Sequence, residues 1–319
     1  MEFLYLLEKI RNPFLDGFFS FVTLLGDETV FLALAICVLW CVSKREGYYI
    51  LSAGLFGLVV NQVMKLACAV PRPWVRDPNF TIVESAREAA RGYSFPSGHS
   101  QNATGTFGAV AVFAKPKWIK ITASALAGLI IFSRLYLGVH TPADVLFSLA
   151  FGIFLLTALR PLFRSDERFH CAMPFILAAG VLLSVLMALW FSTRPSEGLD
   201  YENLLSAKET AATLLGCIIG LSGVYALDRF FIKFDTKAPW YAQVLKLTLG
   251  FALVLLIKSG LKAPLGLIFE NGLVARSIRY FLVVAFAGGV WPLTFRYFAK
   301  IKISSLDRLG ERVAARLKK

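Results

Sequence analysis

Residues 47–69 read GYYILSAGLFGLVVNQVMKLACA, a continuous apolar segment without an acidic residue. A helix of about 20 such residues crosses the hydrocarbon core of a bilayer. Similar apolar segments lie on both sides of it, at 29–42, 98–114, 118–137, 142–159, 173–191, 210–227, 244–261 and 277–295. Because a helix satisfies its own backbone hydrogen bonds in lipid, these segments predict an all-α, polytopic helical membrane protein with about nine transmembrane helices.

The composition of the whole chain agrees with this fold class. Hydrophobic residues make up 57% of the chain and charged residues only 17%, whereas soluble domains carry about 25% charged residues. The formal net charge is +13, but no aromatic-basic platform accompanies it, so we expect no nucleic-acid partner. The five cysteines are odd in number and lack metal-ligand spacing, which predicts small buried hydrophobes rather than disulfides or a metal site.

The basic residues between the apolar segments predict an orientation in the membrane. They fall in alternate loops, at Lys44 and Arg45, at Lys115, Lys117 and Lys120, at Arg160, Arg164 and Arg168, and at Arg229, Lys233 and Lys237. The opposite loops are richer in acids, such as Asp77 and Glu84. By the positive-inside rule we expect a multi-pass protein of the cell (plasma) membrane, with its N-terminus outside and its C-terminus inside.

The two ends of the chain differ in character from the apolar body. Residues 1–28 mix apolar and charged positions and are interrupted at Asn12-Pro13, which favours interfacial helices; a poorly apolar first span is the alternative, and it would add a tenth helix. Residues 300–319 predict a basic cytoplasmic tail on anionic lipid. Between these ends, residues 29–165 hold all the polar motifs, and residues 170–299 add further transmembrane helices.

Three compact polar motifs interrupt the apolar segments. They are Lys65 with Arg72-Pro73, then Pro96-Ser97-Gly98-His99, then Ser133-Arg134 with His140. In the expected topology all three reach the same side of the membrane. Arginine binds a phosphoryl group as a planar fork and lysine binds it as a point charge. Ser97 and Gly98 precede a predicted helix, so they suit either an oxyanion cradle or a simple helix N-cap.

The two histidines are the only nucleophile candidates that stand beside these cations. Histidine attacks phosphorus or protonates a leaving alkoxide near neutral pH, and His99 and His140 both lie in the motifs. No cluster of carboxylates and histidines suggests a metal site. Asp144 admits two interpretations: it completes a capping box with Thr141, or it accepts the Nδ1–H of His140 and fixes its tautomer.

In their order and spacing these motifs resemble the three signature motifs of the type 2 phosphatidic acid phosphatase (PAP2) superfamily, and the resemblance covers roughly residues 50–160. It implies a PAP2-type helical core within 29–165 and a metal-independent hydrolysis through a phosphohistidine, with no cofactor and no metal. By this resemblance His140 is the nucleophile, Asp144 its orienting partner and His99 the general acid. The phosphate cradle that it implies consists of Lys65, Arg72, Ser97, Gly98 and Arg134.

We therefore expect a membrane phosphatase with its site on the extracytoplasmic face. Its partners are membrane lipids and a lipid phosphate substrate, either a phosphomonoester or a polyprenyl or lipid diphosphate such as undecaprenyl diphosphate. The alternatives are a lipid phosphotransferase of the same superfamily and a non-catalytic transporter of anionic lipids, which needs no pair like His140 and Asp144. Lys258 and Lys262 lie near the end of one later span, where they suit either snorkelling anchors or a second anion site beside the first.

Overall fold

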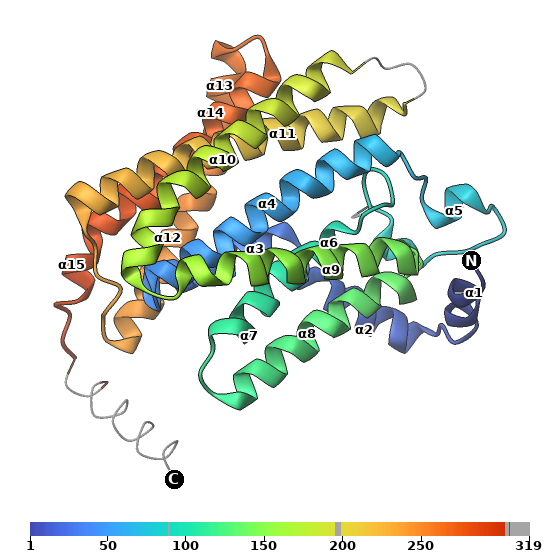
Figure 1. Ribbon diagram of the computed structural model, residues 1–319, viewed down its shortest axis with the longest axis horizontal. Coiled ribbons are helices and arrows are strands. Elements are labelled where there is room, and N and C mark those ends of the chain that lie inside the picture. The colour runs from blue at the N-terminus through green and yellow to red at the C-terminus, as the bar shows by residue number, and fades with distance from the viewer. Residues whose placement is uncertain (89, 195–198, 304–305, 307–319) are drawn as a thin grey trace. The chain divides into compact units, whose positions relative to one another are not determined.

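The computed structural model describes residues 1–88, 90–194, 199–303 and 306, and every regular element in these ranges is a helix (Figure 1). Seven helical segments are long and apolar enough to span a membrane: Lys44–Arg76, Lys117–Tyr136, Pro142–Phe163, Asp166–Thr193, Tyr201–Ile232, Trp240–Ile268 and Gly272–Phe298. The all-α polytopic class is thereby confirmed. Most of the expected basic tail, at 304–305 and 307–319, lies outside the described residues.

The expected count of nine spans is not confirmed, and two segments account for the difference. Residues 98–114, predicted to span, form a continuous helical run of α6 (Gly98–Ala103), a π-helical turn (Thr104–Gly108) and α7 (Ala109–Phe113). This run is slightly shorter than a typical spanning helix, so its crossing stays a prediction. Residues 29–42 correspond to α3 (Glu28–Cys41), which qualifies as a span only together with α2 (Pro13–Leu24), across a 48° bend.

The N-terminal residues form the expected pair of helices. α1 spans Glu2–Lys9, and the predicted break at Asn12-Pro13 is confirmed because Asn12 Oδ1 accepts the amide of Leu15 and caps α2 at 3.0 Å. At the bend before α3, Asp27 Oδ1 accepts the amide of Thr29 at 2.8 Å. Their interfacial position stays a prediction.

The described chain divides into two compact units, each considered by itself. The first consists of Met1–Ala35 and Tyr48–Leu215, and the second of Ile36–Gly47 and Gly216–Lys319. The boundaries fall inside α3, α4 (Lys44–Cys68) and α11 (Tyr201–Leu227). All three polar motifs belong to the first unit.

Within the first unit, α6 is packed against both α8 (Lys117–Tyr136) and α9 (Pro142–Leu159), and α2 packs on α8. Gly152 lets α9 approach the π-helical turn closely, because a Cβ there would lie 2.6 Å from Cγ2 of Thr104. This packing brings the start of α6, the end of α8 and the start of α9 together.

Two later helices complete the first unit. α10 (Asp166–Thr193) and the first half of α11 pack against α4 through a buried cluster that includes Leu58, Leu66, Phe191 and Leu214. Tyr93, from the loop before α6, belongs to the same cluster. Residues beyond 170 therefore help to hold the elements that carry the motifs.

The second unit contains α12 (Trp240–Gly260), α13 (Lys262–Ile268) and α14 (Gly272–Ala285) together with the end of α11. Trp40 lies at its centre, with its ring near those of Phe251 and Phe295, and its Nε1 donates to the carbonyl of Ala287 at 3.0 Å. Burying the large apolar surface of tryptophan while pairing its N–H stabilises this packing.

Candidate active site

Arg72 connects the loops that carry the three motifs. Its Nε donates to the carbonyl of Gly92 at 3.0 Å, and its Nη2 donates to the carbonyl of Arg91 at 2.8 Å. Nη1 donates to the carbonyl of Val139, next to His140, at 2.9 Å. Lys65 lies beside it at the end of α4 and donates to the carbonyl of Tyr93 at 2.6 Å. The expected Lys65, Arg72 and His140 are thus brought together.

The contacts of His140 define its tautomer. Nη1 of Arg72 lies 2.9 Å from His140 Nε2, and because a guanidinium only donates hydrogen bonds, Nε2 is the acceptor. The ring proton is therefore on Nδ1, which lies 3.4 Å from Oδ2 of Asp144. This is the tautomer that presents the lone pair of Nε2 to an incoming group.

The carboxylate of Asp144 forms the predicted capping box and also lies close to His140. Its Oδ2 accepts the amide of Thr141 at 2.7 Å, and Oγ1 of Thr141 accepts the amide of Asp144 at 3.4 Å, so the predicted capping box is confirmed. The same Oδ2 faces His140 Nδ1. It also accepts a hydrogen bond from the hydroxyl of Ser94 at 2.6 Å. Ser94, fully buried, was not identified from the sequence.

We expect Ser94→Ala to lower kcat about tenfold, the equivalent of about 1.4 kcal/mol, while KM stays within about twofold. The hydroxyl of Ser94 fixes the carboxylate that orients His140, so its loss affects the reacting imidazole rather than substrate binding. Ser148→Ala is the matched control, because this buried serine donates instead to the backbone carbonyl of Asp144, at 3.0 Å. Steady-state kinetics that show equal losses in both variants would reduce Ser94 to a packing role.

The electrostatic environment keeps His140 neutral. Burial, together with the nearby charges of Arg72, Arg134 and Lys65, holds the pKa of His140 well below its usual value. The imidazole is therefore neutral at neutral pH, and its Nε2 lone pair accepts the hydrogen bond from Arg72. Burial and the charges of the same three cations also lower the pKa of His99, in the first turn of α6. The negative charge of a bound phosphoryl group would offset these cations and favour protonation of His99.

Arg134 is fully buried near the end of α8, and its guanidinium is only partly paired. Nη1 donates to Oγ1 of Thr23 at 2.6 Å. Among the described residues, neither Nε nor Nη2 has a hydrogen-bond partner, and the same holds for the side-chain amide of Asn61. Asn61 lies close to Gly98, since a Cβ at Gly98 would be 3.8 Å from its Oδ1. A buried N–H group without a hydrogen-bond partner lowers the stability of the fold. The unpaired N–H groups of Arg134 and Asn61 are therefore suited to bind an oxyanion.

Ser97 is the N-cap of α6, as one of the two interpretations predicted. Its Oγ accepts the amide of Ser100 at 3.4 Å and the hydroxyl of Ser100 at 2.9 Å. Its own backbone amide donates to the carbonyl of Asp144 at 3.2 Å. The amide of Ser97 is thus engaged within the protein and is not a free donor for an oxyanion.

The N-terminal helices hold the loop between the first two motifs. Arg11 donates through Nε to the carbonyl of Tyr136 at 3.0 Å, and through Nη1 to the carbonyl of Thr81 at 2.8 Å. The hydroxyl of Tyr5 donates to Asp77 at 2.8 Å. Together with Thr23 beside Arg134, these contacts make residues 1–28 part of the surroundings of the site.

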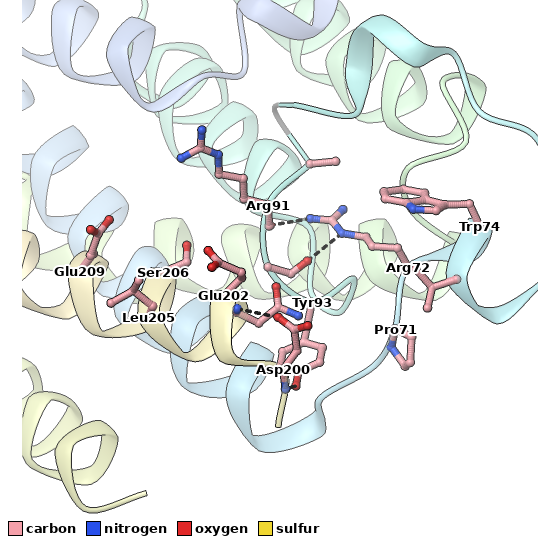
Figure 2. Close-up of a pocket in the computed structure, with 14 residues that line it drawn as sticks. Pro71, Arg72, Trp74, Arg91, Tyr93, Asp200, Glu202, Leu205, Ser206 and Glu209 are labelled. Atoms are coloured by element: carbon pink, nitrogen blue, oxygen red, sulfur yellow. Dashed lines mark hydrogen bonds between the residues drawn. The ribbon is translucent and has the colours of Figure 1, made fainter. Parts of the chain in front are cut away.

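A cavity of about 680 Å³ lies beside Arg72. Figure 2 shows the guanidinium of Arg72 near Trp74 on one side, and Asp200, just before α11, with Glu202 of α11 on the other. The amide of Asp200 donates to the hydroxyl of Tyr93 at 3.2 Å, which ties the start of α11 to the loop before α6. Residues from the additional helices therefore line the approach to Arg72.

Comparisons with known proteins match two stretches of the chain to one superfamily. Residues 46–168 match the model of the PAP2 superfamily, and residues 209–303 match the model of the PAP2 superfamily phosphatase transmembrane extension. All eight site residues expected from the sequence lie in the first match. The second match covers α11 from residue 209 onward together with α12, α13 and α14.

The curated relatives are lipid phosphatases. The chain is 32% identical to undecaprenyl-diphosphatase BcrC of Bacillus subtilis over 149 residues, 45% of this chain and 72% of that protein. It is 28% identical to phosphatidylglycerophosphatase B of the same organism over 173 residues, 50% of this chain and 81% of that protein. No solved structure gives a significant match.

The chain therefore belongs to the PAP2 superfamily. Its apolar spanning helices and its match to the transmembrane extension make it a multi-span membrane member of that family. The expected enzyme class, a PAP2-type lipid phosphatase, is confirmed at this level by the family match and the relatives.

Proposed function

We propose that this enzyme hydrolyses a lipid phosphomonoester, or the terminal phosphate of a diphosphate lipid, through a phosphohistidine at His140 and without a metal ion. The observation that carries this proposal is the placement of His140 between two groups: Nη1 of Arg72 lies 2.9 Å from its Nε2, and Oδ2 of Asp144 lies 3.4 Å from its Nδ1. A carrier of anionic lipids needs cations but gains nothing from an oriented, neutral imidazole. The pair of His140 and Asp144 therefore favours a nucleophile over a binding site.

In the first step, Nε2 of His140 attacks phosphorus and the bond to the leaving oxygen breaks. His99 gives its proton to that oxygen, which is the role of a general acid. The incoming phosphoryl oxygens draw the N–H of Arg72 away from Nε2, which frees the lone pair. Arg134 and Lys65 stabilise the charge that develops on the phosphoryl oxygens, and Asp144 stabilises the charge on the imidazole.

In the second step, water attacks the phosphohistidine and gives its proton to His99. The N–P bond breaks, so that inorganic phosphate leaves and His140 returns to its neutral tautomer. His99 is protonated again and both histidines are restored. The cycle requires only the lipid phosphate and water.

The names of the relatives support a substrate class. They act, by name, on undecaprenyl diphosphate and phosphatidylglycerophosphate, and a probable sphingosine-1-phosphate phosphatase of Dictyostelium discoideum is 27% identical over 46% of this chain and 38% of its own length. Their shared chemistry is a terminal phosphoryl group on a membrane lipid. Phosphate release by the purified full chain from each of these lipids and from phosphatidic acid tests the class, and a failure with all four would contradict it.

Turnover is expected to survive chelation by EDTA, because Lys65, Arg72 and Arg134 supply the positive charge that a metal provides in other phosphatases. Vanadate is expected to inhibit, since it mimics the five-coordinate phosphorus of the transition state. Both effects are measured as initial rates of phosphate release. Loss of activity in EDTA that Mg²⁺ or Zn²⁺ restores would overturn the metal-independent mechanism.

We propose that the site faces the extracytoplasmic side of the plasma membrane. A cysteine at Asn79, which is exposed in the loop between Arg72 and His99, is expected to react with a membrane-impermeant thiol reagent in intact cells. A cysteine at the exposed Lys117 is expected to react only after permeabilisation. Both substitutions belong in a background without the five native cysteines, since Cys68 and Cys171 are exposed. The reverse labelling pattern would invert the topology.

A further inference from the structure

A groove between α12, α13 and α14 in the second unit gathers four cationic side chains. Its volume is about 650 Å³, and it is lined by Lys258, Lys262, Arg276 and Arg279, by Ser259, and by the apolar Ala252, Leu255 and Leu256. Among the described residues, no carboxylate and none of the expected catalytic residues lines it. We refer to it as the α12–α14 groove.

Three of the four cations in this groove, Lys258, Lys262 and Arg279, are poorly compensated by the described part of the chain. Lys258 and Lys262 are four residues apart, a spacing at which like charges on a helical surface repel. Lys258, Lys262 and Arg279 form no ion pair with any residue that the structure describes, and within the same ranges the buried Nε of Arg279 lacks a hydrogen-bond partner. An anion in the groove would relieve the repulsion and pair this donor.

Snorkelling alone does not account for this arrangement. A snorkelling lysine extends individually toward the headgroups. Here Lys258 of α12 and Arg279 of α14 both lie near the same aromatic ring. The ring centroid of Tyr280 is 5.8 Å from Nζ of Lys258 and 5.4 Å from Cζ of Arg279. Basic pockets between transmembrane helices are suited to anionic headgroups.

The walls of the groove indicate a lipid rather than a free ion. Leu255 and Leu256 are 57% and 64% exposed. In the span Trp240–Ile268, only 11% of an apolar stretch of 18 residues is buried by the described chain. The cations therefore adjoin an uncovered apolar surface on a helix long enough to cross the membrane. A ligand that matches both parts carries a negative headgroup and a hydrocarbon chain.

We propose that the α12–α14 groove binds an anionic phospholipid, with its phosphate among Lys258, Lys262 and Arg279 and an acyl chain along Leu255 and Leu256. The bound lipid is a phosphodiester and differs in this respect from the proposed substrates. This site stands independently of the phosphatase mechanism, because it shares no residue with it.

Lipid titration of the purified full chain, followed by native mass spectrometry, tests the proposal. Phosphatidylglycerol is expected to bind more tightly than phosphatidylcholine, and Lys258→Gln with Lys262→Gln is expected to weaken its binding roughly 30-fold, about fivefold for each lost cation. The matched control is Lys117→Gln with Lys120→Gln, which removes two exposed cations from α8. That control, and Arg134→Gln in the candidate active site, are expected to change binding by less than about threefold.

Two further measurements distinguish a lipid site from a site for a free anion. Arg279→Gln is expected to weaken phosphatidylglycerol binding about fivefold, while unfolding temperatures in phosphatidylcholine stay equal for all variants. Glycerol 3-phosphate and inorganic phosphate are expected not to displace the lipid, because they lack an acyl chain. Equal binding of the two phospholipids, equal losses in both double variants, or displacement by inorganic phosphate would overturn the assignment of a lipid site.

Discussion

Replacement of His140 with alanine is expected to lower kcat/KM at least about 10⁴-fold, the scale of losses when a covalent nucleophile is removed. His140 is the neutral imidazole whose Nε2 is presented by Arg72 and whose Nδ1 faces Asp144. No other described side chain has this combination of partners. Phosphate release from a lipid substrate, measured with verified folded protein, gives the result directly.

The third histidine provides the matched control for this variant. His170 lies on α10, outside the motifs, and His170→Ala is expected to leave kcat/KM within about twofold. His99→Ala separates the two proposed roles, because a substrate with an acidic leaving group needs little proton donation and should lose much less activity than a lipid alcohol ester. His140→Ala activity above a few per cent of the wild-type value would remove the nucleophile assignment.

Arg134→Gln is expected to lower kcat/KM about 10²- to 10³-fold, because its guanidinium is proposed to stabilise charge that develops on the phosphoryl oxygens. Arg134→Lys is expected to recover little of this loss, since a lysine lacks the planar fork. The unfolding temperature should not fall in the glutamine variant. Arg134 is fully buried beside other cations, and its Nε and Nη2 have no hydrogen-bond partner among the described residues. Removing this buried charge therefore removes a destabilising desolvation cost.

Kinetics and thermal unfolding of the same preparations check this combination. Arg160→Gln, at the far end of α9, controls for the loss of one positive charge and is expected to retain activity. A fall in unfolding temperature that parallels the fall in activity would make Arg134 a structural residue. Retained stability with lost turnover is the signature of a group held in place for binding.

The site could be predicted from the sequence wherever local spacing determines geometry. The capping box of Thr141 and Asp144 and the N-cap at Ser97 depend on residues within one helical turn, so the pattern was sufficient. The approach of Lys65, Arg72 and His140 followed from the alternation of spans. Ser94 could not be found in this way, because its bond to Asp144 joins residues 50 positions apart in the chain.

Two further residues differ in how far the sequence could reveal them. Asn61 is a polar residue inside an apolar span, and such a residue is by itself a sign of a functional site. Thr23 gave no such signal, because its contact with Arg134 depends on how α2 packs against α8. The shortened span at 98–114 was likewise hidden, since composition does not reveal a π-helical turn.

The helices after residue 170 mark the limit of prediction from composition. Helices that are apolar on every side show no face that identifies a partner, so the packing of α10 and α11 on α4 was not foreseeable. This packing places Asp200 and Glu202 at the cavity beside Arg72. The sequence indicated which residues carry the chemistry but not which helices enclose it.

Trapping of the phosphoenzyme tests the central proposal most directly. Purified His99→Ala protein, in which hydrolysis of the intermediate should be slowed, is mixed with a diphosphate lipid labelled in its terminal phosphate, because the lipid monophosphate that leaves needs little proton donation from His99. The reaction is quenched in alkali and the protein is mapped by mass spectrometry. A phosphohistidine mechanism predicts a phosphoryl group on the peptide that contains His140, bound to Nε2 and absent when His140 is also replaced by alanine. Label on another residue, or turnover by the wild-type enzyme through direct attack of water with no labelled protein, would contradict it.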